Sequence, residues 1–133
     1  MKMKWLMALS ALVLVISCEI ESDIDNAPDE MIVGKWMVQS MEFFGETVSG
    51  DGSYLEFKEC SATCSGIDYM ATDRTSGSFT YVLNESATVL EIVDNTSDGG
   101  SYNGSWDILE LSDSKFRIVG NTSFGSLKLE MTK

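Results

Sequence analysis

The feature of this sequence that most constrains its fold is a period-two alternation of apolar and polar residues, repeated in short runs. In one run, Phe79, Tyr81 and Leu83 alternate with polar residues. Successive side chains of a strand point to opposite faces, so each run predicts a strand with one buried and one solvated face. No stretch of this region shows a helical period over several turns. Runs of this kind cover residues 55–57, 67–71, 79–83, 90–92, 106–108, 116–118 and 127–131.

Clusters of turn residues separate these runs, as in Gly50-Asp51-Gly52 and Ser112-Asp113-Ser114. With a first run from Ile32 to Phe44, the sequence predicts eight strands in about a hundred residues. Short connections favour antiparallel neighbours, and closure into a barrel removes the exposed edges of an open sheet. We therefore predict an all-β domain, a small eight-stranded antiparallel up-and-down barrel, with a two-sheet β-sandwich as the alternative. A barrel of this size holds either packed side chains or one small ligand.

Two runs depart from simple alternation. From Ile32 to Phe44, apolar residues occupy both even and odd positions, which predicts a strand covered on both faces. After Ile108, the apolar positions shift to Leu109 and Leu111. A shift of this kind indicates a β-bulge or the end of a strand.

The N-terminal segment has the pattern of a secretory signal. Lys2 and Lys4 precede an uncharged, mostly apolar run that ends at Ile16 and is too short to span a bilayer. The residues Val15-Ile16-Ser17-Cys18 then resemble the lipobox of bacterial lipoproteins, although Ile16 replaces the usual small residue. The resemblance implies a signal peptide over residues 1–17. It also implies that Cys18 is the lipid attachment site, which anchors the protein to a membrane through its acyl chains.

Residues 18–31 are expected to form a flexible tether between this anchor and the folded domain. Six acidic residues lie between positions 19 and 30, and no basic residue occurs between Cys18 and Lys35. Such a segment repels itself and buries little surface. An acidic cluster behind a lipidated cysteine also resembles the surface-export signal of some Gram-negative lipoproteins. We therefore expect a protein of the outer membrane, with the cell surface favoured over the periplasmic face, and a barrel domain over residues 32–133.

The composition disfavours several functions. The chain has 9 basic and 21 acidic residues, a net charge of −12. Nucleic acid binding requires a basic surface, so we expect no nucleic acid partner. The sequence contains no histidine, which excludes histidine-based triads and histidine metal sites. No spacing forces two carboxylates together, so we expect no enzyme activity, no cofactor and no metal.

Two further cysteines, Cys60 and Cys64, lie in the segment CSATC. The cell envelope is oxidising, and two remaining thiols in such a compartment often pair. We predict a disulfide between them. The alternatives are free thiols or a metal pair, and a single C-x3-C without histidine is a weak zinc motif.

Two segments resemble parts of a known family. Residues Gly34 to Met41, GKWMVQSM, resemble the Gly-x-Trp opening of lipocalins, in which the tryptophan closes the floor of the barrel. Residues Trp106 to Ile118, WDILELSDSKFRI, are similar to the penultimate hairpin of small bacterial lipocalin-like lipoproteins. The resemblance implies a lipid-anchored envelope lipoprotein whose barrel binds a small apolar ligand in its lumen.

The aromatic side chains expected to face the interior are candidates for a ligand pocket. The alternative for the same residues is a filled core, which a barrel this small favours. In that case the protein would be a non-catalytic interaction or scaffolding module that binds a protein partner through its outer surface. The candidate ligand-binding residues are Trp36, Phe57, Tyr69, Phe79, Tyr81 and Trp106, and Phe116 belongs to the same set.

A polar segment, residues 94–107, partly matches a calcium-binding loop. Asp94, Thr96 and Asp98 occupy ligand positions, but Ser105 stands where a bidentate glutamate is expected. We interpret the segment as a polar hairpin loop, and the sequence leaves open whether it binds a cation.

Overall fold

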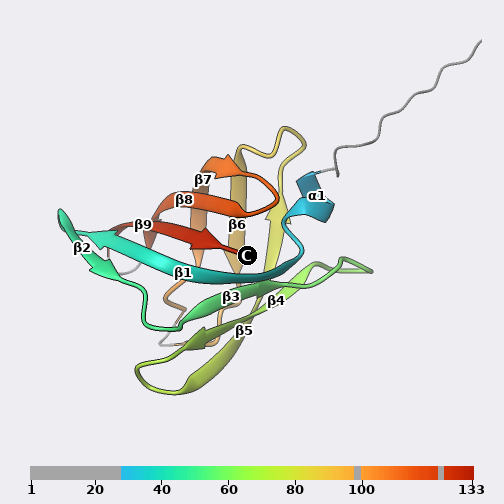
Figure 1. Ribbon diagram of the computed structural model, residues 1–133. Helices are drawn as coiled ribbons and strands as arrows, with labels where there is room; N and C mark the ends of the chain where they lie inside the picture. Colours follow the sequence, from blue (N-terminus) through green and yellow to red (C-terminus); the bar gives the residue numbers. More distant parts are fainter. Residues whose placement is uncertain (1–27, 98–99, 123–124) are drawn as a thin grey trace, which may run out of the picture.

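A computed structural model of the protein describes residues 28–97, 100–122 and 125–133. Within them the chain is almost entirely β-structure (Figure 1). No helix of the described part is long and apolar enough to cross a membrane. The elements are α1 (Pro28–Met31), β1 (Gly34–Phe43), β2 (Glu46–Ser49), β3 (Tyr54–Phe57), β4 (Ser65–Met70), β5 (Thr75–Leu83), β6 (Val89–Val93), β7 (Gly104–Leu111), β8 (Lys115–Thr122) and β9 (Gly125–Thr132).

Eight of the strands form a closed barrel. The sheet order is β2-β1-β3-β4-β5-β6-β7-β8-β9, and β1 also pairs with β9. Every pairing is antiparallel between neighbours, so β1 and β3 to β9 make an up-and-down barrel. This confirms the predicted fold class and excludes the two-sheet sandwich. Strand β2 is additional: it forms a hairpin with β1 and was not expected from the sequence.

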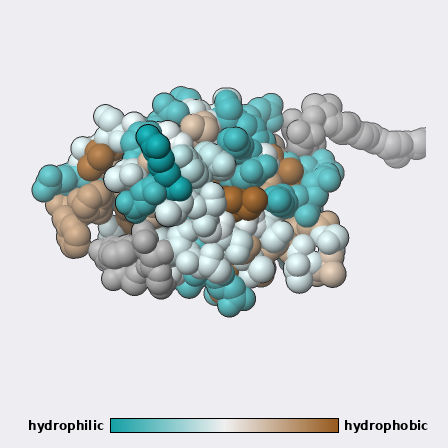
Figure 2. Space-filling view, turned by 90° about the horizontal axis from the view of Figure 1, so that it is seen from below, coloured by the Kyte–Doolittle hydropathy of each residue, from teal (hydrophilic) through white to brown (hydrophobic). Residues whose placement is uncertain are grey.

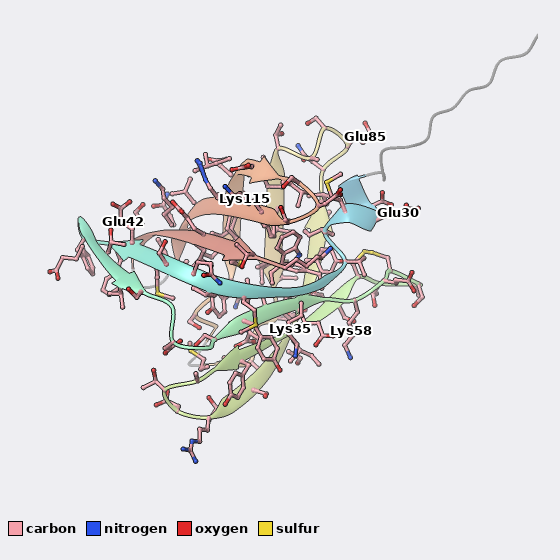
Figure 3. The ribbon with its side chains drawn as sticks, in the orientation of Figure 1. Glu30, Lys35, Glu42, Lys58, Glu85 and Lys115 are labelled. Atoms are coloured by element: carbon pink, nitrogen blue, oxygen red, sulfur yellow. A yellow bond between two sulfur atoms is a disulfide. The ribbon has the colours of Figure 1, made fainter. Side chains whose placement is uncertain are left out.

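Up-and-down connectivity sends alternate connections to opposite ends of the barrel. In Figure 1, α1 lies on the right and the β1–β2 hairpin projects to the left. Figure 3 shows Glu30 and Glu85 on the side of α1 and Glu42 on the side of the hairpin. We call these the α1 end and the hairpin end. The α1 end holds α1 and the connections 58–64, 84–88 and 112–114; the hairpin end holds the connections 44–45, 50–53, 71–74 and 94–103.

The α1 end is packed with aromatic side chains. Trp36 lies 5.2 Å from Phe116 between ring centroids, and Phe57 lies 5.9 Å from Phe116. Phe57 also meets Phe79 and Tyr81 edge to face, at 5.4 and 5.0 Å. Aromatic pairs at these separations contribute packing beyond simple burial. This part of the barrel has a solid core.

A short segment closes the α1 end. Residues 28–31 were expected to belong to the flexible tether, but they form the helical turn α1, and Ile32 behind it is fully buried. The indole Nε1 of Trp36 donates a hydrogen bond of 2.8 Å to the carbonyl of Ile32. The Nζ of Lys133, at the C-terminus, donates to the carbonyl of Met31 at 3.0 Å and lies 4.6 Å from the centroid of the Trp36 ring.

The irregular strand β1 contains a β-bulge. Its pairing with β9 steps from Val38 opposite Met131 to Ser40 opposite Glu130, and this leaves Gln39 as the extra residue. The interior face therefore passes from even to odd positions along β1. The prediction that this strand is covered on both faces is wrong, because one bulge accounts for the change of parity.

The predicted irregularity after Ile108 is also a bulge. The pairing of β7 with β8 steps from Ile108 to Glu110, and Leu109 is 46% exposed. The shift of apolar parity in the sequence thus marked a real change in backbone register.

Strand β4 faces the opposite way from the prediction. Gly66 and Asp68 are buried, whereas Tyr69 lies on the outer face, stacked on Tyr54 at 5.2 Å between ring centroids. The inward orientation predicted for Tyr69 is wrong. A Cβ on Gly66 would lie 2.4 Å from the Cζ of Phe79, so the glycine leaves room for that ring in the core.

Candidate functional site

The hairpin end of the barrel contains a cavity of about 700 Å³. It is bordered by the β1–β2 hairpin, the segment 50–53, the end of β4, the loop 94–103 and the start of β9, and it opens to solvent. Its apolar lining comes from Val38, Met41, Phe43, Phe44, Val48, Met70, Tyr102 and Leu127. Its remaining lining comes from Ser49, Gly50, Asp51, Ser53, Thr72 and Ser101.

The volume and lining of this cavity are those of a small-molecule site. Such sites occupy roughly 300–1,000 Å³ and combine a mainly apolar wall with a few fixed polar groups. Two methionines, Met41 and Met70, add flexible and polarisable side chains that adapt to irregular ligands. The bulge in β1 contributes directly, because it turns Met41 and Phe43 toward the cavity.

The wall near the bulge depends on a glycine. The N–H of Gly50 donates a hydrogen bond of 2.8 Å to the carbonyl of Gln39. A Cβ at Gly50 would lie 1.9 Å from the carbonyl oxygen of Val38, closer than real atoms approach. Only glycine allows the segment 50–53 to pass this close to β1, and this contact forms one side of the cavity.

A hydrogen-bonded carboxylate lies at the edge of the cavity. Oδ1 of Asp51 accepts from the backbone N–H and the hydroxyl of Ser53, at 3.1 and 2.7 Å. Oδ2 accepts from the hydroxyl of Thr72 at 2.8 Å, across the gap to the β4–β5 turn. These bonds, first that from the Ser53 side chain and then that from Thr72, hold the pKa of Asp51 below its ordinary value of 3.8. The group is therefore ionised at neutral pH.

A buried polar cluster anchors the loop over the hairpin end. The side-chain amide of Asn95 donates to Oδ1 of Asp68 at 2.8 Å and to the carbonyl of Ser78 at 3.2 Å. Its oxygen accepts from the backbone N–H of Tyr102 at 2.9 Å. Asp68 is fully buried, and its Oδ2 accepts no hydrogen bond from the part of the chain that the structure describes. The loop is thus held by polar contacts to the barrel interior.

The described residues of the polar loop do not assemble carboxylates around a point. Asp94 is exposed and has a φ of 55°, whereas Asn95 turns into the barrel. The described residues contain no group of three or more His, Cys, Asp or Glu side chains that could hold a metal ion. Asp98, one of the candidate ligands, lies outside the described residues.

None of the predicted ligand-binding residues lines the cavity. Five of them are buried in the core, and Tyr69 lies on the outer face. The five buried residues are Trp36, Phe57, Phe79, Tyr81 and Trp106, to which Phe116 is added. These six side chains belong to a filled core, which was the alternative to a ligand pocket in the sequence analysis.

The cavity-lining residues carried little signal in the sequence. Met70, Val38 and Leu127 resemble any other core residues, and only the packing shows that they border open space. Asp51 lies in a Gly-Asp-Gly turn, where an aspartate commonly bonds to a nearby backbone N–H. That pattern predicts the contact with Ser53 but not the neighbouring cavity.

The predicted disulfide is present at the α1 end. Cys60 and Cys64 are joined, with their Cα atoms 4.2 Å apart. Their loop lies beside Tyr81, whose hydroxyl donates to the carbonyl of Lys58 at 2.8 Å and is 3.7 Å from the Cys60 sulfur. Burial, and secondarily the negative charge of Asp29, raises the pKa of Tyr81 above its ordinary value of 10.0. The predicted lipid attachment site, Cys18, lies outside the described residues.

Apolar side chains are exposed beside the cavity. Phe44, at the tip of the β1–β2 hairpin, is 80% exposed, and Val48 on β2 is 47% exposed. Figure 2 shows brown and tan atoms at the left end of the molecule, the side from which the hairpin projects in Figure 1. These residues extend the apolar lining to the mouth of the cavity.

Comparison with known proteins bears on the fold alone. No family model matches the sequence, and no curated protein matches it. Among solved structures, the chain is similar to a redesigned β-barrel with a TM-score of 0.54 and 20% identity. The match covers 84% of this chain and 98% of the other. At this identity the likeness supports the closed barrel architecture and carries no information on function.

Proposed function

We propose that the protein is a lipid-anchored envelope lipoprotein whose lipocalin-like barrel binds a small, mainly apolar molecule at its hairpin end. The observation that supports this is the cavity of about 700 Å³ with its largely apolar lining. The anchor and the outer-membrane location rest on the sequence pattern around Cys18. The binding site differs from the one first expected, because the predicted interior aromatics fill the core and a different set of side chains, including Met41, Met70 and Leu127, borders the space.

Binding is tested by titrating the purified chain, carrying Cys18→Ser to remove the acyl acceptor, with a neutral apolar dye such as N-phenyl-1-naphthylamine. The dye should bind saturably, with a rise in its fluorescence. Met70→Trp fills the cavity and should weaken binding by about tenfold or more, because the apolar contact area is lost to the new side chain. Val82→Trp is the matched control, since Val82 is 60% exposed on the outer face of β5.

A second filling variant guards against a loss of fold at Met70. Leu127→Phe enlarges a lining residue on β9. Strand β9 pairs with the edge of β1 that does not pair with β2. Circular dichroism of each variant checks that the barrel is retained. The proposal is wrong if wild-type protein shows no saturable binding, or if both folded filling variants bind the dye as well as Val82→Trp does.

The lipid anchor has its own test. Cys18→Ser should abolish incorporation of a fatty-acid analogue and block processing of the precursor, whereas the wild type should be labelled and float with membranes. Retention of the label by Cys18→Ser would place the anchor elsewhere and remove the basis for the outer-membrane location.

A second candidate function is a protein–protein interaction module. One observation favours it: Phe44 and Val48 form an exposed apolar pair on the β1–β2 hairpin. The two candidates differ in one readout. A ligand-binding protein should bind the dye saturably, and Met70→Trp should weaken that binding. An interaction module should bind its protein partner through Phe44 and should show no saturable dye binding.

A further inference from the structure

The charges around the cavity have one sign. Among the described residues that line it, Asp51 is the only charged one. Its carboxylate lies at the edge of the apolar space, held by Ser53 and Thr72. A carboxylate accepts about four hydrogen bonds, and these partners donate three, so acceptor capacity remains for a ligand.

No basic residue belongs to the described lining of the cavity. Lys128 on β9 points to the outer face, where its Nζ lies 3.8 Å from a carboxylate oxygen of Glu42. Arg74 is exposed in the β4–β5 turn and does not contribute to the lining. The structure does not describe residues 98–99 and 123–124, and none of these four is a lysine or an arginine. A ligand at the mouth therefore meets a negative charge without a compensating cation from the described lining.

We propose that the cavity binds long-chain amines, a cationic class of amphiphile, and that Asp51 excludes fatty acids of the same length. This inference rests on the proposed ligand-binding function. A chain of methylenes fits the apolar interior, which leaves the head group at the mouth, beside Asp51. There an ammonium group gains a charge-assisted hydrogen bond, whereas a carboxylate is repelled. The net charge of −12 acts in the same direction at longer range.

The test compares three probes with the same twelve-carbon chain: dodecylamine, 1-dodecanol and dodecanoate. Each displaces the neutral dye from the chain carrying Cys18→Ser, at neutral pH and low ionic strength. Dodecylamine should bind about tenfold more tightly than dodecanoate, with dodecanol between them, because two charges near a protein surface interact by a few RT. Added salt should reduce this spread, since it screens exposed charges.

Asp51→Asn should remove the preference. It keeps a hydrogen-bond acceptor for Ser53 and loses the charge, so dodecylamine should fall to the affinity of dodecanol while dodecanol is unchanged. The matched control is Asp113→Asn, which alters the net charge equally but lies in the 112–114 turn at the α1 end. Asp113→Asn should keep the order of the three probes.

Two outcomes overturn the inference and are distinguishable. If dodecanol and the dye bind but dodecanoate binds as tightly as dodecylamine, or if Asp51→Asn keeps the advantage of the amine, the charge selection is wrong and the binding function stands. If neither the dye nor dodecanol binds, the proposed function fails and this inference with it. If Asp51→Asn does not fold, the salt dependence of the wild type decides the question. A difference in affinity between dodecylamine and dodecanoate that added salt does not reduce would contradict the role of an exposed charge.

Discussion

The two ends of the barrel are built on the same strands but differ in how their interiors are filled. At the α1 end, Phe116 packs against both Trp36 and Phe57, and all three side chains are buried in the core. At the hairpin end, Val38, Met70 and their neighbours border a cavity of about 700 Å³.

The difference lies in how closely the inward side chains pack and in what covers each end. The α1 end is closed by a helical turn that hydrogen bonds to Trp36 through Ile32. The hairpin end is bordered by a projecting hairpin and a polar loop, neither of which fills the interior. A small barrel can therefore combine a stable core with a binding site, because the core occupies one end of its strands and the site occupies the other end.

The largest expected effect comes from truncating one aromatic side chain at each end of β1. Trp36→Ala should lower the free energy of unfolding by about 3–5 kcal/mol, because it opens a void in close-packed surroundings. Phe43→Ala should cost only about 1 kcal/mol, since Phe43 is half-buried and already borders open space. Urea denaturation followed by circular dichroism measures both. Equal losses would mean that the two ends are packed alike.

A smaller effect is expected from the disulfide, which belongs to the α1 end. Replacing both cysteines, Cys60→Ser with Cys64→Ser, should lower the free energy of unfolding by about 2 kcal/mol, because the bridge restrains the unfolded chain over a loop of short sequence separation. The same variant should bind the neutral dye as the wild type does. A change in dye affinity would show that the two ends are coupled.

The smallest effect concerns pH and Tyr81. Because the pKa of Tyr81 is raised in the folded chain, the unfolded chain loses its phenolic proton first. The stabilising contribution is therefore present below the ordinary tyrosine pKa and is lost as the pH rises toward the folded value.

Tyr81→Phe should reduce this alkaline loss of stability. The measurement is the difference in unfolding free energy between about pH 8 and about pH 10.5, where unfolded tyrosines ionise. Tyr54→Phe, on the outer face, is the comparison variant. An identical alkaline loss in Tyr81→Phe and the wild type would remove Tyr81 as its source.

Much of the fold was predictable because the alternation of apolar and polar residues along each strand is a local pattern. The eight strands of the barrel, the bulge after Ile108 and the Cys60–Cys64 disulfide all follow from short-range patterns. The burial of Trp36 and Trp106 in one interior is likewise confirmed. These features depend on neighbours along the chain, which a sequence displays directly.

The site was less predictable because it depends on contacts between distant segments. Asp68 occupies an inward position on β4 because Asn95, far along the chain, bonds to it. The local alternation of residues instead predicted that the larger side chain of Tyr69 faces the interior. Strand β2 also escaped prediction, since all four of its residues are exposed and it lacks a buried face. A cavity is set by what the packing leaves unfilled, and no pattern of single residues records that.

Closure of the barrel has a consequence for how the protein behaves among its own copies. Since β1 pairs with β9 along one side and with β3 and β2 along the other, β2 carries the one free sheet edge among the described strands. That edge is four residues long and begins with Glu46. Short, charged edges are poor templates for strand addition, which is the first step of amyloid-like growth. Copies at high concentration should therefore stay dispersed, and their shared negative charge favours the same outcome.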